Sequence, residues 1–202
     1  MDEQQQQRVV EDLSGLLRGE LCCDVLTASL YASDASLYQM SPLGVAYPLD
    51  RDDVVTLARY SAETNLPLIA RGAGSGIAGG AIGSGLIVDF SRHMRNVVSV
   101  DGETVRVQPG IVRDELNRIL KKHDRYFAPD PSNTAVTTVG GMLAVDAAGS
   151  HSVRVGSTRD HVQSLELVLA GGIVIEAANE SLGILKSSPG HVGDTPHELK
   201  NA

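Results

Sequence analysis

Amphipathic stretches of the chain predict three helices. Apolar residues recur on one face of residues 5–19, and the same spacing places leucine and isoleucine on one face of residues 114–122. Asp50 is a suitable N-cap for a helix that runs to about residue 63, because acidic residues fill the first turn and complement the helix dipole. We expect residues 1–30 to contribute an amphipathic N-terminal helix that packs against a larger domain.

Short apolar runs between these helices predict strands. Asp101-Gly102 and Gly171-Gly172 each lie between two such runs and are typical of hairpin turns. A mixture of strands and helices in this order predicts an α+β (α/β) fold with one compact domain of one or two lobes. The predicted strands are residues 45–48, 66–70, 86–90, 97–100, 105–108, 162–169 and 173–176.

Residues 71–85 are the most unusual segment, because seven of these fifteen residues are glycine. No packed helix or strand needs so many glycines, whereas a glycine-rich loop can turn its backbone N–H groups onto an anion. The stretch Gly74–Gly79 matches the G-x-G-x-x-G pattern of dinucleotide sites, but the glycines that follow forbid the helix that such a site requires. We interpret the segment as a phosphate-binding loop between two strands; the alternative is a flexible loop without a ligand.

A second group of small and hydroxyl-bearing residues lies further along the chain. Small side chains let a flat ligand approach the backbone, while hydroxyls and free N–H groups form hydrogen bonds to it. Two separated groups of this kind indicate a large ligand that is held from both ends. The second group comprises residues 127–132, 137–142, 147–152 and 156–160.

Charge and hydropathy argue against two classes of partner. The formal net charge of −8 at pH 7 disfavours binding to nucleic acid, whose phosphates need a basic surface. No apolar run approaches the roughly 20 residues that span a bilayer, and the glutamine-rich start is unlike a secretory signal. We therefore expect no nucleic-acid partner, no transmembrane segment and a cytoplasmic location.

Cysteine and histidine positions do not predict a metal site. Cys22 and Cys23 are adjacent, and two neighbours alone build neither a zinc site nor an iron–sulfur cluster, so we expect buried thiols at the end of the N-terminal helix. The histidines lack the spacing of metal ligands. Only His151 lies in a small-residue segment, where it is either a ligand contact or a structural histidine. No set of residues predicts a catalytic centre, so no catalytic residue is assigned.

Several short motifs occur in a fixed order and are more informative together than singly. The motifs are Tyr31–Ser36, Val45–Pro48, Asp50–Val54, Arg71–Gly76, Asp89–Met94, Val107–Gly110, Pro129–Ser132 and Gly140–Met142. Together they resemble the FAD-linked oxidase family, the vanillyl-alcohol-oxidase-like flavoproteins with a PCMH-type FAD-binding domain. The most similar branch is that of the D-2-hydroxyacid dehydrogenases, which includes glycolate oxidase flavin subunits, D-lactate dehydrogenases and FAD/iron–sulfur fusion proteins.

The resemblance implies a FAD-binding domain over residues 31–178, with two α/β lobes and FAD between them. In covalent members of the family a histidine near the position of Ser75 is tethered to the flavin; serine cannot form that bond, so non-covalent FAD is expected. The cofactor-binding residues implied by the resemblance are Arg71, Gly72, Ala73, Gly74, Ser75, Gly76, Gly79, Gly80, Ala81, Pro129, Thr137, Thr138, Gly140, Gly141, Asp146, Gly149, Ser150, Gly156, Ile173 and Val174.

Three positions depart from the pattern of this branch. Val145-Asp146 stands where an Asn-Asn pair is common, Val155 stands in place of a tyrosine, and Gly171 in place of an aspartate. An ionised aspartate only accepts hydrogen bonds, so Asp146 would add negative charge near the phosphates. The alternative is that Asp146 is a solvated carboxylate away from the ligand.

The resemblance also implies an activity. It is hydride transfer from a D-2-hydroxy acid of the D-lactate, D-2-hydroxyglutarate or glycolate type to flavin N5, with a quinone or an iron–sulfur domain as electron acceptor. Family members bind the substrate with a separate cap domain, which we expect to be missing here, with residues 179–202 a poorly ordered tail. The isolated chain is therefore expected to bind FAD without turnover.

Two alternative functions remain open from the sequence. One is a catalytically silent FAD- or nucleotide-binding module. The other is a different flavin enzyme on the same domain, such as an enolpyruvyl-sugar reductase or a molybdenum-hydroxylase FAD subunit, which the segments 34–36 and 129–132 disfavour.

Overall fold

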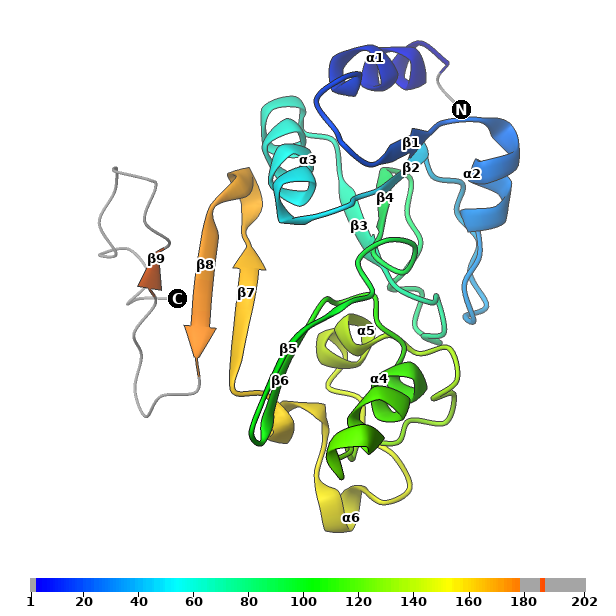
Figure 1. The fold of residues 1–202 in the computed structure, drawn as a ribbon. Coiled ribbons are helices and arrows are strands. Elements are labelled where there is room, and N and C mark those ends of the chain that lie inside the picture. The colour runs from blue at the N-terminus through cyan, green and yellow to red at the C-terminus, as the bar shows by residue number, and fades with distance from the viewer. Residues whose placement is uncertain (1–2, 179–185, 188–202) are drawn as a thin grey trace, which may run out of the picture.

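The computed structural model describes residues 3–178 together with residues 186 and 187. Two lobes and a separate hairpin follow one another along the chain (Figure 1). The helices are α1 (Glu3–Leu13), α2 (Val25–Tyr31), α3 (Arg51–Thr64), α4 (Arg113–Leu120), α5 (Val139–Ala144) and α6 (Ser152–Val155). The strands are β1 (Glu20–Cys22), β2 (Gly44–Tyr47), β3 (Leu68–Arg71), β4 (Leu86–Asp89), β5 (Val97–Asp101), β6 (Thr104–Val107), β7 (Ser164–Val168), β8 (Val174–Ala178) and β9 (Lys186–Ser187).

The first lobe is built on a sheet of strand order β1-β2-β4-β3. Strands β2, β4 and β3 run parallel, and β1 is antiparallel to β2. Every residue of β2 and β4 is buried, so apolar side chains cover both faces of the sheet centre. Leu13 of α1 and Leu57 of α3 pack with Ala46 and Val88 on one face, and Val45 and its neighbours form a smaller cluster on the other.

The second lobe combines the β5–β6 hairpin with helices α4 and α5. Its core contains Ile111, Leu116 and Leu120, and Val139 of α5 packs against them. The hairpin turns at Gly102, whose φ of 55° is in the left-handed region that glycine adopts readily. The predictions of this hairpin and of a helix near residues 114–122 are thus confirmed.

The third sheet contains the antiparallel strands β7 and β8, with β9 paired to β8. The predicted turn at Gly171-Gly172 is confirmed, and it packs against α3, where a Cβ at Gly172 would lie 2.6 Å from Arg59 Cγ. Except for the β9 residues, the predicted tail over residues 179–202 lies outside the described part of the chain.

The N-terminal prediction was wrong in three respects. Helix α1 ends at Leu13 and does not reach Gly19, because the chain turns at Gly15, which has a φ of 76°. Cys22 belongs to β1, so the cysteines do not end the helix, and both are half-buried. Burial and the neighbouring Cys22 and Asp24 raise the pKa of the Cys23 thiol to about 11. Residues 1–30 therefore supply a strand of the main sheet and most of α2 as well as helix α1.

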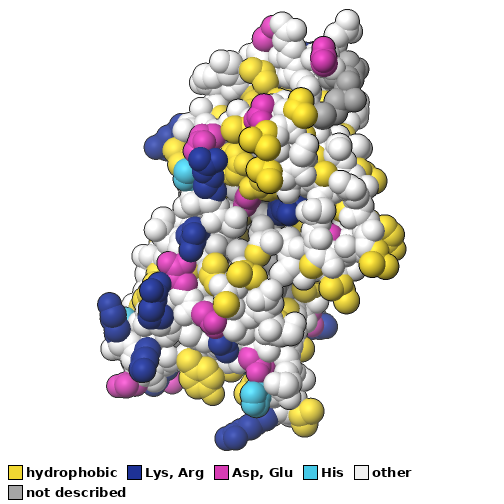
Figure 2. All heavy atoms as spheres, turned by 90° about the vertical axis from the view of Figure 1, so that its right-hand side faces the viewer, with side chains coloured by type: hydrophobic (Ala, Val, Ile, Leu, Met, Phe, Trp, Pro, Cys, Tyr) yellow, Lys and Arg dark blue, Asp and Glu magenta, His cyan; other side chains and the backbone are white. Residues whose placement is uncertain are grey.

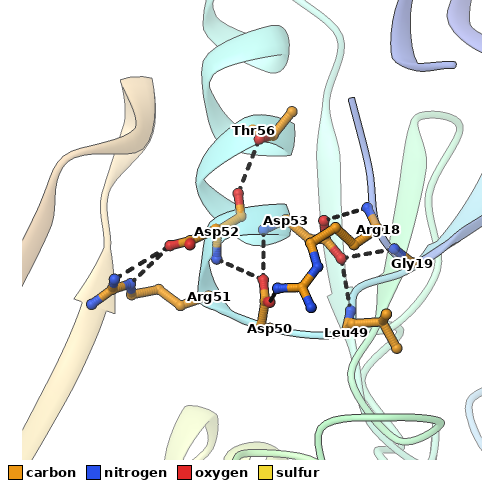
Figure 3. A network of polar contacts seen from close by, with 8 residues as sticks. All are labelled: Arg18, Gly19, Leu49, Asp50, Arg51, Asp52, Asp53 and Thr56. Atoms are coloured by element: carbon orange, nitrogen blue, oxygen red, sulfur yellow. Dashed lines mark hydrogen bonds and ion pairs between the residues drawn. The ribbon is translucent and has the colours of Figure 1, made fainter. Parts of the chain in front are cut away.

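A buried carboxylate fixes the N-terminal end of α3 (Figure 3). Asp53 accepts hydrogen bonds from the backbone N–H groups of Arg18 (2.8 Å), Gly19 (2.9 Å) and Leu49 (2.9 Å). Asp50 is the N-cap, as predicted, and accepts from two N–H groups of the first turn. Asp53 thereby joins three segments: the approach to β1, the end of β2 and helix α3.

We expect Asp53→Ala to lower the free energy of unfolding by about 3 kcal/mol, because three backbone N–H donors lose a buried, charged acceptor. Asp52→Ala is the matched control, since Asp52 is the preceding residue of the same helix turn and its side chain is exposed. Its cost should stay below about 1 kcal/mol. Urea unfolding followed by circular dichroism measures both; equal losses would contradict the role given to Asp53.

Candidate functional site

The glycine loop, defined as residues 72–85, joins two neighbouring parallel strands without an intervening helix, as predicted. It leaves the carboxyl end of β3 and must return to the start of β4, so its last part runs back over β3. There the backbone packs closely: a Cβ at Gly83 would lie 2.7 Å from Ile69 Cγ1, and one at Gly85 would lie 2.0 Å from the Pro67 carbonyl oxygen. These two glycines are needed for packing.

The outer half of the loop, residues 72–80, is distinguished by its backbone N–H groups. Within the described part of the chain, no group accepts a hydrogen bond from a backbone N–H of these residues. Gly76 and Gly80 are exposed, and no atom lies within 4 Å of the place where a Cβ would be. Free N–H groups on a backbone without side chains fit a diphosphate, whose oxygens accept several hydrogen bonds.

The outer half of the loop contacts the second lobe at Thr137 and Thr138. A Cβ at Gly72 would lie 2.1 Å from Thr138 Oγ1, so the loop backbone packs directly on a threonine of the other lobe. The hydroxyls of Ser75 and Thr137 are 3.4 Å apart. Thr138 is fully buried and caps α5 by accepting from the Gly141 N–H. The structure therefore brings together five of the predicted cofactor-binding residues.

Gly140 is also held close to the second lobe's core. Its N–H donates to the Pro109 carbonyl at 2.8 Å, and a Cβ there would lie 2.7 Å from Pro109 Cβ. Two side chains of α4, which were not predicted from the sequence, hold the segment that contains Pro129. Asn117 exchanges two hydrogen bonds with the backbone of Phe127, and Arg113 Nε donates to the Pro129 carbonyl at 3.0 Å. Nothing in the local pattern around these two residues indicated such partners.

Gly149 and Ser150 lie beside Asp130. A Cβ at Gly149 would lie 2.1 Å from the Asp130 carbonyl oxygen, and Ser150 Oγ donates to the Asp130 carboxylate at 3.3 Å. His151 Nδ1 pairs with the same carboxylate, and hydrogen bonds from His151 and Ser150 lower the pKa of Asp130. His151 thus has a partner within the chain, which favours its structural interpretation.

Asp146 is neutralised by an arginine. Its carboxylate accepts the backbone N–H of Arg159 at 3.0 Å and pairs with the Arg159 guanidinium. The Arg159 N–H, the Ser157 hydroxyl and the Arg159 side chain together lower the pKa of Asp146. The residue has a φ of 48°, a left-handed conformation that Asn and Asp tolerate. Asp146 thus carries a negative charge, as expected, but the guanidinium of Arg159 compensates it.

Three further predicted residues lie at the β7–β8 turn or at the end of α6. Ile173 and Val174 are at the turn between β7 and β8, which packs against α3. Gly156 ends α6, and a Cβ there would lie 2.3 Å from Asp160 Oδ2. None of the hydrogen bonds found among the described residues connects these three to residues 72–85.

Side chains around the loop offer little concentrated positive charge. Figure 2 shows the face on the right-hand side of Figure 1, where basic side chains are scattered among acidic and hydrophobic ones. Apolar side chains stand near the loop, including Ile77 at its exposed tip and Tyr38, whose ring lies against Gly79. Recognition of a phosphate at this loop must therefore depend mainly on backbone N–H groups.

Residues 42–178 match the family described as "FAD binding domain". The chain belongs to this family. The FAD-binding assignment and the α+β fold of the PCMH-type flavoproteins, both expected from the motifs, are thereby confirmed. A solved alkyldihydroxyacetonephosphate synthase has the same fold, with a TM-score of 0.75 and 25% identity over 86% of this chain and 38% of its own.

Curated relatives are longer than this FAD-binding domain. D-2-hydroxyglutarate dehydrogenase of Pseudomonas putida is 40% identical over 185 residues, which are 88% of this chain and 18% of the relative. Glycolate oxidase subunit GlcD of Bacillus subtilis is 31% identical over 156 residues, 75% of this chain and 33% of its own. The chain thus spans a fifth to a third of these two relatives. Within the described residues, no helix has the length and apolar character to cross a membrane.

We expect Gly72→Ala to lower the free energy of unfolding by about 2 kcal/mol, because its Cβ would overlap Thr138 Oγ1 and force the lobes apart. Gly76→Ala is the control in the same loop, since its Cβ enters open space. It should leave stability unchanged or raise it by about 0.5 kcal/mol. Thermal unfolding measures both.

Adding Thr138→Ala to Gly72→Ala removes the overlapping oxygen. The double variant should then lose less stability than the two single changes combined. Strict additivity would show that this contact does not join the lobes.

Proposed function

We propose that the chain is the FAD-binding part of a flavin-dependent oxidoreductase that oxidises a D-2-hydroxy acid. The observation that carries the FAD site is the row of N–H groups over residues 72–80 that have no acceptor among the described residues, next to the hydroxyls of Ser75 and Thr137. The substrate class is supported by the names of the relatives, among them D-2-hydroxyglutarate dehydrogenase and glycolate oxidase subunit GlcD.

In this proposal the outer half of the glycine loop binds the FAD diphosphate, and the segment of Thr137 and Thr138 faces the same ligand from the second lobe. Ser75 has a hydroxyl, which donates or accepts a hydrogen bond but forms no tether to the flavin, so the cofactor is dissociable. Bound flavin would supply a ring that accepts a hydride. The chain's own contribution is to bind and orient that group.

The remaining assignments follow from the same proposal. The hydroxy acid would be held by a cap domain outside these residues, and the electrons would pass to a quinone or an iron–sulfur domain. The proposed location is cytoplasmic.

Three arginines of the chain already have partners within it: Arg71 binds backbone carbonyls, Arg92 pairs with Glu20, and Arg159 pairs with Asp146. These three are not arranged to bind a substrate carboxylate.

Titration of the purified chain with FAD, followed by quenching of flavin fluorescence, tests the cofactor site. We expect saturable binding, and we expect Gly80→Val to weaken it at least tenfold, because the new side chain enters the space that the diphosphate would occupy. Since no atom of the described residues lies within 4 Å of a Cβ at Gly80, the unfolding midpoint should stay the same.

Ser99→Val on the exposed face of β5 adds similar bulk away from the loop and should leave FAD affinity unchanged. Acid precipitation of the FAD-loaded protein should release the flavin into the supernatant. Unchanged affinity of Gly80→Val would place the diphosphate elsewhere, and a yellow pellet would contradict dissociable FAD.

The FAD-loaded chain alone should not be reduced by a hydroxy acid. Hydride transfer requires the substrate carbon about 3–3.5 Å from the acceptor atom, with a positioned base for the hydroxyl proton. We expect the flavin absorbance to persist for minutes after millimolar D-2-hydroxyglutarate, D-lactate or glycolate is added. Dithionite, which reduces free and bound flavin, is the positive control. Rapid bleaching by one of the acids would show that these 202 residues contain a complete substrate site.

A further inference from the structure

Arg71 stands where β3 ends and the glycine loop begins, and the side chain is surrounded by backbone carbonyls. Its Nη2 donates to Ser33 O at 2.9 Å, and its Nη1 donates to Ala81 O at 3.0 Å and to Tyr31 O at 3.4 Å. Its Cζ lies 4.9 Å from the centroid of the Tyr31 ring, within the range of a cation–π contact. Both terminal nitrogens of the guanidinium are thus already bound to the protein.

The Tyr31 ring is itself held in place by a hydrogen bond from its hydroxyl group to β4. Its hydroxyl donates to Asp89 Oδ2 at 2.5 Å, and Asp89 is buried at the end of β4, where it also accepts from Ser91. Burial and the hydrogen bond to Asp89 raise the pKa of Tyr31, so the phenol remains a neutral donor. The ring that faces Arg71 therefore has a fixed orientation.

The loop is wrapped around this guanidinium. A Cβ at Gly74 would lie 2.7 Å from Arg71 Nη2, and the Gly74 carbonyl accepts the Ala35 N–H at 2.9 Å. At the far end of the outer half, the Ala81 N–H donates to Asp34 at 3.4 Å. Arg71 and its partners thus fix the start, the middle and the end of the outer half, while the N–H groups of residues 72–80 remain unpaired.

We propose that Arg71 is a positioning residue for the cofactor, resting on the FAD site proposed above. It holds the glycine loop in the shape that presents free N–H groups, and it does not bind the diphosphate itself. Glycine-rich backbone has many accessible conformations, so a loop that is ordered before binding loses less entropy when the ligand arrives. The planar fork of arginine serves three carbonyls at once, which the single ammonium of lysine cannot do in the same geometry.

Two substitutions separate positioning from direct charge contact. Arg71→Lys keeps the positive charge and loses the fork, whereas Arg71→Met loses both. If Arg71 positions the loop, both variants bind FAD at least tenfold more weakly and differ from each other by less than threefold. Arg92→Met is the matched control, because Arg92 lies 4.5 Å from the centroid of the Tyr47 ring but pairs with Glu20, outside the loop. It should bind FAD as the unmodified chain does.

A second readout needs no FAD. The Ala35 amide is hydrogen-bonded to the Gly74 carbonyl, so its hydrogen exchange, measured by NMR, reports the position of the loop. We expect this amide to exchange at least tenfold faster in both Arg71 variants, and we expect a several-fold smaller increase for the core amides of β4. A general loss of stability would instead accelerate exchange in the core to the same extent.

Wild-type affinity in Arg71→Lys together with a loss in Arg71→Met would show that charge is what matters and would overturn the positioning role. Unchanged Ala35 exchange in both variants would also overturn it. If the unmodified chain does not bind FAD at all, the proposed function fails, while the Ala35 measurement still decides whether Arg71 holds the loop.

Discussion

The two lobes meet where the backbone of Gly72 lies against Thr138, and the site depends on this contact. No side chain fits between them, since a Cβ at Gly72 would be 2.1 Å from the threonine oxygen. The contact places the start of the glycine loop beside the N-cap of α5, so two segments more than sixty residues apart in the sequence lie side by side. Glycine is required here because of its small volume, which is a packing constraint and not a demand for flexibility.

Around this contact, charged side chains are paired within the chain and do not point at the expected ligand. Asp146 pairs with Arg159, Asp130 with His151, and Arg71 binds backbone carbonyls. Among the described residues, the donors without a partner are instead backbone N–H groups of residues 72–80. The proposed site would therefore recognise a diphosphate through fixed dipoles, and it would need a rigid surrounding structure because no long side chain could adjust to the ligand.

Most elements were predictable where one local signal dominated. Helix α3 begins at its acidic N-cap, and the β5–β6 and β7–β8 hairpins turn at glycines, because caps and turns depend on neighbours in the sequence. The N-terminal region was less predictable. Leucines continue the helical spacing beyond Leu13, yet Gly15 ends α1, and β1 forms only because β2 provides a partner that is distant in the chain. Strand formation depends on such pairing more than on local preference.

For the site, the sequence by itself determined which positions have no side chain, which residue stands where a tether would form, and that a glycine-rich loop lies between two strands. It did not determine what each polar side chain binds. Arg71 finds its carbonyl partners 38 and 40 residues before it and 10 residues after it, and Asp146 finds Arg159 13 residues away. These pairings exist only after α2, the sheet and the loops have packed, because hydrogen bonds need atoms within about 3 Å and local sequence does not set distances between remote segments.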